Sequence, residues 1–311
     1  MKIFCLTLFA FVGATAQDLR LGIIGTDTSH AGAFTKTLND VTNPDHITGA
    51  RVVAAFKGGS PDIEESASRV DKYATELQDK WGIKLVDKIS DLCPLVDGLL
   101  LESVDGRPHL AQFKEAAQCG KPVFIDKPLA STLDDALAID QLARQMHIPW
   151  FSSSSLRYSD IENMKSADAI GAIVWGPGPL EVHHKLDMTW YGIHAVEMLY
   201  TLFGAGCVEV TRMKSADEDV ITARWKDGKL GTIHLQRPYG KFGAVVFLKG
   251  NKLNAEPDIQ FSYVPLVRAI VAFMQTKKPA VPNEVTLEMF AFMDAAQRSE
   301  ADGGKSMTLA H

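Results

Sequence analysis

Short apolar runs alternate with helical patterns through the first half of this chain, and this alternation constrains the fold more than any other feature. The segments between the runs carry apolar residues at helical spacing. Runs that are apolar on both faces are typical of parallel strands, which helices cover on both sides. The pattern therefore predicts an α/β domain with a doubly wound parallel sheet over residues 17–155. The apolar runs lie at residues 20–25, 50–56, 96–101, 122–126 and 148–151.

The second half of the chain has a different pattern. Its strand-like runs mostly alternate between apolar and polar residues, as in sheets with one exposed face. We therefore expect an α+β domain over residues 156–311, with an open antiparallel sheet and C-terminal helices. The expected strands are 180–185, 209–213, 220–225, 230–235 and 244–248, with a hairpin turn at 226–229 and helices at 192–203, 264–275 and 284–300.

The first sixteen residues differ from the rest. Lys2 precedes an apolar run from Ile3 to Ala14, and Ala14-Thr15-Ala16 forms a small-x-small site. This order is typical of a cleaved secretory signal peptide, and the apolar run is too short for a permanent membrane anchor. We therefore expect residues 1–16 to be removed and the protein to be exported, either to the periplasm or out of the cell.

Charge and cysteine content exclude some partners. The net charge is −6 and the basic residues are scattered, so we expect no nucleic-acid partner. After loss of the signal peptide, Cys93, Cys119 and Cys207 remain, without a CxxC pair or a zinc-like His/Cys spacing. No metal site is expected. Buried free thiols are the favoured interpretation, and one disulfide is the alternative, which the sequence alone does not pair.

The first predicted strand leads into a turn that is a candidate cofactor site. Rossmann-type folds place G-x-G-x-x-G here, because the glycines let the backbone approach a pyrophosphate. This turn keeps only the first glycine, and Asp27 puts a carboxylate where phosphates lie, so we expect Asp27→Gly to raise nucleotide affinity. Ordinary helix capping by Asp27, Thr28 and Ser29 is an equally weighted alternative. The turn consists of Gly25, Thr26, Asp27, Thr28, Ser29 and His30.

Further candidate cofactor contacts follow the next two strands. The strand at 50–56 ends in Lys57, whereas NAD-binding folds usually carry an acid there. A lysine suits a 2′-phosphate or no nucleotide at all. The strand at 96–101 is followed by Glu102 and Ser103, and His109 begins the next helix. These residues lie at C-terminal strand ends, where open α/β sheets bind ligands.

Lys127 follows the apolar strand at 122–126 and precedes Pro128, which ends that strand. An ammonium group is thereby placed at the mouth of the sheet, directly after Asp126. A lysine at a strand end is more often an ordinary surface residue. The neighbouring motifs decide between these two interpretations.

The order of features resembles the glucose-fructose oxidoreductase, inositol dehydrogenase and MocA family. Residues 120–128 match its G-K-x-V-x-x-E-K-P motif, and residues 192–197 match its G-x-H-x-x-D motif. The resemblance implies a Rossmann-type domain followed by an open sheet that carries the substrate. It implies hydride transfer between NAD or NADP and a sugar or polyol, with Lys127 at the reacting hydroxyl and His194 as acid or base. By analogy it also implies a homo-oligomer.

The chain departs from this family next to the histidine. The family commonly has an aspartate four residues before it, and this chain has Trp190. Two alternatives therefore stand beside the oxidoreductase: nicotinamide-assisted cleavage of a glycoside, and a non-catalytic carbohydrate-binding relative that has lost nucleotide binding. The candidate substrate contacts are Asp126, Arg157, His183, Asp187, Trp190 and Tyr191.

Overall fold

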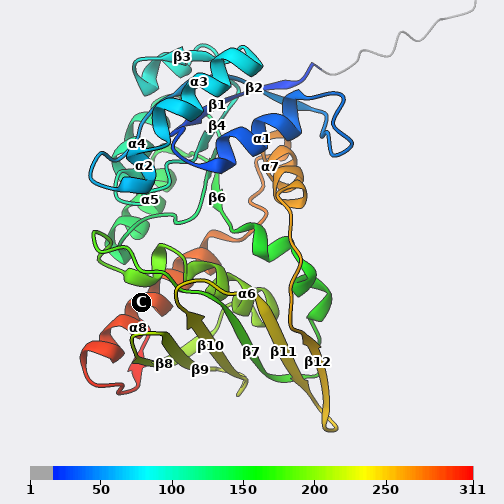
Figure 1. Ribbon diagram of the computed structural model, residues 1–311, viewed down its shortest axis with the longest axis vertical. Helices are drawn as coiled ribbons and strands as arrows, with labels where there is room; N and C mark the ends of the chain where they lie inside the picture. Colours follow the sequence, from blue (N-terminus) through cyan, green and yellow to red (C-terminus); the bar gives the residue numbers. More distant parts are fainter. Residues whose placement is uncertain (1–16, 311) are drawn as a thin grey trace, which may run out of the picture.

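The computed structural model describes residues 17–310, and the predicted signal peptide lies outside this range. Two sheets form the molecule, one in each half (Figure 1). The first sheet is entirely parallel, in the order β3-β2-β1-β4-β5-β6, as the doubly wound pattern predicts. Its strands are β1 Leu19–Ile24, β2 Ala50–Phe56, β3 Lys84–Val86, β4 Gly98–Leu101, β5 Val123–Ile125 and β6 Trp150–Ser152.

Helices cover both faces of the parallel sheet. The helices α1 and α3 pack with α7 in one apolar cluster, and α4 and α5 pack in another. The helix α7 comes from the C-terminal part of the chain, so that part returns to complete the first layer, beside α1 (Figure 1). The helices are α1 Ser29–Asn39, α2 Glu64–Ala67, α3 Val70–Trp81, α4 His109–Ala117, α5 Leu133–Met146 and α7 Val264–Thr276.

The second sheet is mixed rather than purely antiparallel. Its order is β12-β11-β7-β10-β9-β8-β13, and the pair β7 and β10 is parallel. The helices α6 Ile193–Phe203 and α8 Asn283–Ala301 pack against it, and almost all of α6 is buried. The strands are β7 Ala169–Pro177, β8 Cys207–Lys214, β9 Glu218–Trp225, β10 Leu230–Gln236, β11 Gly243–Leu248, β12 Lys252–Glu256 and β13 Met307–Thr308.

Three expectations for this half need correction. Residues 180–185 form turns rather than a strand, because their polar side chains find local partners, as His183 does with Glu181. The strand β7 was not predicted, since Gly171 and Gly176 interrupt its apolar pattern. The strand β12 was also not predicted, because it is short and mostly exposed.

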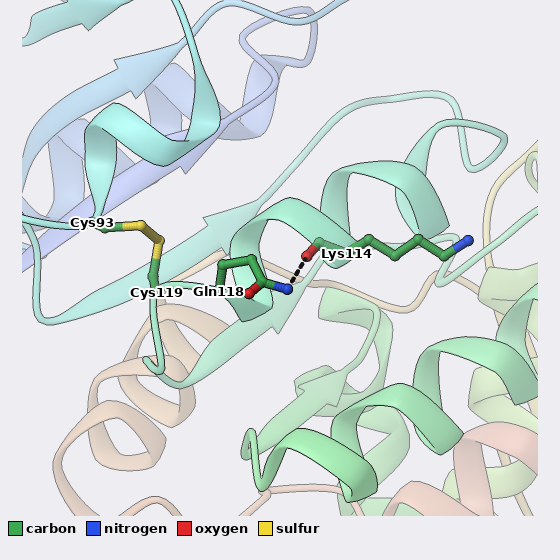
Figure 2. The surroundings of a disulfide bond; sticks show 4 residues. All are labelled: Cys93, Lys114, Gln118 and Cys119. Atoms are coloured by element: carbon green, nitrogen blue, oxygen red, sulfur yellow. Dashed lines mark hydrogen bonds between the residues drawn. A yellow bond between two sulfur atoms is a disulfide. The ribbon is translucent and has the colours of Figure 1, made fainter.

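Two of the three cysteines form a disulfide, which corrects the expectation of free thiols. Cys93 and Cys119 are bonded, with Cα atoms 4.8 Å apart (Figure 2). Cys93 caps the short 3₁₀ helix at Ile89–Leu92, and Cys119 follows α4. Both positions resemble buried helix ends in sequence, which explains the incorrect expectation. Cys207 is a buried free thiol, as expected.

We expect Cys93→Ala to lower the free energy of unfolding by about 3 kcal/mol, because the bond closes a loop between cysteines 26 positions apart. Urea unfolding of the variant and of wild type measures this difference. Cys207→Ala is the matched control, since it removes a buried thiol without opening a loop. Equal stability of wild type and Cys93→Ala would contradict the expectation.

Among residues 17–310, no helix combines the length and the apolar character that a membrane span needs.

Candidate active site

A small polar cavity lies where the C-terminal edge of the parallel sheet meets α6. Its volume is about 130 Å³. Ligand pockets commonly measure about 300–1,000 Å³, so this cavity suits a small molecule or one part of a larger one. Lys127 and His194, which lie in different halves of the chain, both line it. The charged and polar lining residues are Thr28, Ser29, His30, Glu65, Arg69, Lys127, Ser155 and His194, together with Tyr191, Tyr239 and Tyr263.

Lys127 leaves β5 and reaches the cavity beside Tyr191. Its Nζ lies 5.6 Å from the centroid of the Tyr191 ring, which is within the range of a cation–π contact. Burial lowers the pKa of Lys127, although the charges of Asp126 and Glu65 oppose this change. The side chain can therefore hold an oxygen as a cation and can also lose its proton more readily than an exposed lysine.

His194 lies in the first turn of α6, and its Nδ1 is 2.7 Å from Ser154 Oγ. Burial lowers its pKa well below the usual range, and the charges of Lys127 and His30 add to the effect. The imidazole is therefore neutral near pH 7 and can accept a hydrogen bond from a hydroxyl group. Ser154 was not predicted as a site residue, although the run of serines after β6 was visible in the sequence.

The predicted cofactor turn is divided between two environments. Thr28, Ser29 and His30 line the cavity with Lys127, so this end of the turn faces the substrate side. Asp126, predicted as a substrate contact, bonds through Oδ2 to His30 Nδ1. Thr28 also caps α1, because its side chain accepts a hydrogen bond from the His30 N–H.

The other end of the turn is packed against the protein itself. A side-chain carbon at Gly25 would lie 2.3 Å from Ser103 Oγ, so the strand end fits tightly against the loop after β4. Thr26 Oγ1 lies 3.2 Å from the carbonyl oxygens of Lys57 and Val70. These contacts leave Gly25 and Thr26 without an open face for phosphate groups.

Asp27 is fully buried and bonded within the protein. Ser66 Oγ donates to its Oδ2 at 2.6 Å, and the Val104 N–H donates to its Oδ1 at 3.3 Å. Burial raises the pKa of Asp27, and these hydrogen bonds oppose the rise. Asp27 therefore does not cap α1, and its carboxyl group anchors residues that follow β2.

We call residues 58–67, which include α2, the covering segment. Its Gly58 packs on Gly25, because a side-chain carbon at Gly58 would lie only 3.2 Å from Gly25 Cα. Its Ser60 donates to Asp105 Oδ2 at 2.6 Å, which joins the segment to the loop after β4. The segment therefore lies over the ends of β1 and β4, the switch point where doubly wound sheets bind dinucleotides.

The remaining predicted cofactor residues serve the protein's own structure. Lys57 is exposed and pairs with Asp71 at 2.6 Å. Ser103 donates to Gln112 at 3.0 Å, and both ring nitrogens of His109 face carbonyl oxygens. Both carboxyl oxygens of Glu102 are buried without a hydrogen-bond partner, and burial together with the charge of Asp126 raises its pKa well above the usual range. None of these four residues lines the cavity.

Five of the six predicted substrate contacts do not line the cavity: Asp126, which is bonded to His30, and four others. Asp187 pairs with Arg212 at 2.8 Å and with Lys214 at 2.9 Å, because a buried arginine on β8 requires carboxylate partners. Arg157 pairs with Glu197, and His183 pairs with Glu181 on the surface. Trp190 packs in an apolar cluster with Ile63 and Val104. Of the six predicted substrate contacts, only Tyr191 lines the cavity directly.

Trp190 joins α6 to the covering segment. It forms a small apolar cluster with Ile63 and Val104, and its ring meets the His184 ring at a centroid distance of 5.3 Å. The tryptophan therefore takes the place of the family's aspartate with an apolar contact, not with a proton-relay contact.

Glu65 and Arg69 are cavity residues that the sequence did not indicate. They form an ion pair four residues apart, and such a pair in an amphipathic helical pattern is usually solvated. Within residues 17–310, no group of three or more His, Cys, Asp or Glu side chains is arranged to hold a metal ion.

The contact between Asp105 and Ser60 of the covering segment is expected to stabilise the fold in a pH-dependent way. Its side chain is 1% exposed, and burial alone would raise its pKa. Hydrogen bonds from His184, Arg107 and Ser60 outweigh burial and lower the pKa. A lowered carboxyl pKa stabilises the fold above the pKa of the unfolded state, about 3.9, and this contribution disappears as the pH falls through the folded value.

We expect Asp105→Asn to cost about 2–3 kcal/mol of unfolding free energy at pH 7, because it removes a charged acceptor of hydrogen bonds from three residues, Ser60, Arg107 and His184. The difference from wild type should shrink as the pH falls below about 4. Urea unfolding from pH 7 to pH 3 measures it. Asp79→Asn, at an exposed position of α3, is the control. If the difference in unfolding free energy between Asp105→Asn and wild type did not change with pH, the lowered pKa of Asp105 would be contradicted.

The fold points to a class: oxidoreductases with a Rossmann-type first domain and a second sheet domain, here with a lysine and a histidine lining one cavity between them. Residues 19–154 match the family model described as oxidoreductase family, NAD-binding Rossmann fold, named GFO_IDH_MocA. Over this part of the chain, the match confirms the resemblance to the glucose-fructose oxidoreductase, inositol dehydrogenase and MocA family that the motifs indicated. No curated protein matches the sequence.

Solved structures share the fold over nearly the whole chain. Myo-inositol dehydrogenase from Lactobacillus casei, in complex with NAD(H) and myo-inositol, is 16% identical, with a TM-score of 0.70 over 95% of this chain and 98% of that one. An oxidoreductase from Agrobacterium radiobacter, in complex with NAD+, L-tartaric acid and magnesium, is 16% identical, with a TM-score of 0.71 over 94% and 98%. At such identities the likeness establishes the fold.

Proposed function

We propose that this protein is an oxidoreductase of the family's type that acts on a hydroxyl group of a sugar or polyol. One observation carries the proposal: Lys127 and His194, from separate halves of the chain, line the same small polar cavity. The L. casei relative is described with myo-inositol, which supports a polyhydroxylated substrate.

The cavity residues account for the proton in such a reaction. Oxidation of an alcohol removes a proton from oxygen and a hydride from carbon. Lys127 can hold the oxygen and favour its ionised form, and His194, neutral near pH 7, can accept a hydrogen bond from the hydroxyl group. The rings of Tyr191, Phe242 and Tyr263 also line the cavity.

The residues that were expected to bind the nucleotide fit this proposed function less well than Lys127 and His194 do. The family binds NAD, but here the covering segment lies across the switch point, and Asp27 is buried where a phosphate-binding glycine is usual. In this arrangement the residues at the turn do not fit a dinucleotide. Nucleotide binding therefore requires the covering segment to move, which lowers the apparent affinity. The same observation favours a second candidate, a reaction at this cavity without net oxidation, such as cleavage of a glycoside.

We also propose export of the protein. The signal-like first sixteen residues support this, and the disulfide between Cys93 and Cys119 is typical of proteins in oxidising compartments.

The proposed activity can be tested by incubating the purified protein with a panel of sugars and polyols at high concentrations of NAD or NADP. With at least one substrate, we expect the absorbance of the reduced cofactor to increase with time. Release of an aglycone from a glycoside without net reduction would replace the oxidoreductase by the second candidate. No reaction on either panel, from protein shown to be folded, would overturn both.

A further inference from the structure

His30 is held in the cavity more firmly than its place in a turn suggests. It is 9% exposed and lies in the first turn of α1. Its ring stacks near Phe34 at a centroid distance of 5.4 Å and meets the edge of Tyr263 at 4.6 Å. These two aromatic contacts fix the plane of the imidazole.

The carboxylate of Asp126 fixes the remaining freedom of that ring. Asp126 is 2% exposed, and its Oδ2 bonds to His30 Nδ1. Its Oδ1 accepts a hydrogen bond from the Lys127 N–H at 2.8 Å, so one carboxylate orients both the histidine and the start of the lysine. With Nδ1 engaged, Nε2 is the nitrogen of His30 left for a ligand.

Glu102 ionises less readily than Asp126, so Asp126 supplies most of the negative charge at this place. Burial raises the pKa of Glu102 well above the usual range, and the nearby charge of Asp126 raises it further. This shift favours the protonated form of Glu102, which then carries less negative charge beside Asp126 than an exposed glutamate would. Two neighbouring carboxyl groups whose environments separate their protonation states are typical of catalytic sites.

His194 differs from His30 in the partner of its Nδ1 atom, which is a hydroxyl group and not a carboxylate. In catalytic histidines a carboxylate at one ring nitrogen stabilises the cation that forms when the other nitrogen takes a proton. His194 has only the Ser154 hydroxyl at Nδ1, and Trp190 replaces the aspartate of the family motif. A carboxylate–histidine pair is present elsewhere at the cavity: His30, in the first turn of α1, lines the cavity and is bonded to Asp126, which follows β5.

We propose that His30 is the catalytic base of this cavity and that Asp126 is its positioning residue. The inference rests on the proposed action on a hydroxyl group. The substrate O–H bond breaks, a new bond forms between that proton and His30 Nε2, and Asp126 stabilises the resulting imidazolium. Lys127 stabilises the oxygen that has lost its proton, and His194 holds the substrate as a neutral hydrogen-bonding group.

The first test does not depend on turnover. Nitrogen-15 NMR of histidine-labelled protein reports which ring nitrogen carries the proton, and His30→Gln assigns the signal. We expect the proton of His30 on Nδ1 in wild type and in Asp126→Glu, and a mixture of tautomers in Asp126→Asn. Glu181→Gln is the matched control, because it breaks the carboxylate contact of the surface residue His183. A proton on Nε2 in wild type would overturn the proposal.

The second test uses the best sugar or polyol of the panel. We expect His30→Gln to lower kcat by roughly 100- to 10,000-fold, as for loss of a general base, with a much smaller change in KM. Asp126→Asn should lower kcat less, and Asp126→Glu should restore part of it. His183→Gln should have no effect. Retained kcat in His30→Gln would overturn the inference while leaving the proposed function intact, whereas correct tautomers without turnover of any substrate would overturn the proposed function alone.

Discussion

Lys127→Met is expected to lower kcat/KM for the best sugar or polyol by about 100- to 1,000-fold, the usual cost of removing one group that stabilises developing charge. Methionine keeps most of the length of the side chain and its apolar stem, so the walls of the cavity should remain in place. The loss should therefore come from the missing amine, which lies beside Tyr191 and is proposed to hold the substrate oxygen.

Steady-state kinetics of the variant measure this loss, and thermal unfolding of the same sample shows whether the fold is retained. Lys114→Met, at an exposed position on α4, is the matched control and should behave as wild type. If Lys127→Met kept full turnover, the cavity would not be the reaction site. If it unfolded at a much lower temperature than wild type, Lys127→Gln would be the variant to compare.

The parallel sheet was predictable because its signal is local. Each of its long strands is an apolar run between helical patterns, and burial on both faces leaves that run without polar residues. The second sheet was harder to predict, since β7 is interrupted by glycines and β12 is exposed. The return of α7 to the first layer depends on a long-range contact, which helical spacing alone does not reveal.

The candidate site was predictable only as far as its motifs extend. The lysine and histidine motifs indicated Lys127 and His194, and both line the cavity. His30 was assigned to the cofactor because of its position in the first turn. Its partner Asp126 is 96 residues away, and no local pattern predicts that contact. Glu65 and Arg69 were missed because their pairing in sequence is typical of a solvated helix.

Two departures from the family are linked in the structure. The replacement of the relay aspartate by Trp190 and the closure of the dinucleotide crevice meet at Ile63, which packs on Trp190 and belongs to the covering segment. The tryptophan therefore helps to hold the segment over the crevice. The carboxylate role that it gave up is available from Asp126, on the other side of the cavity.

Asp27→Gly is expected to tighten binding of NAD or NADP by roughly 10- to 100-fold, because it removes a hydrogen bond to a charged or polar carboxyl group worth about 1.5–3 kcal/mol. The Ser66 contact that it breaks holds the covering segment over the turn, and the same change removes an acid from the expected position of the phosphates. Titration calorimetry with each nucleotide measures the change, and thermal unfolding checks that the variant is folded. Ser66→Ala tests the part played by the carboxyl group, since it breaks the contact with Asp27, and a second one with the Ser60 N–H, but keeps the carboxyl group. If the carboxyl group opposes the phosphates, Ser66→Ala should tighten binding less than Asp27→Gly. Unchanged affinity in Asp27→Gly would show that the turn does not lie under the phosphates, and micromolar binding by wild type would show that the covering segment does not close the crevice.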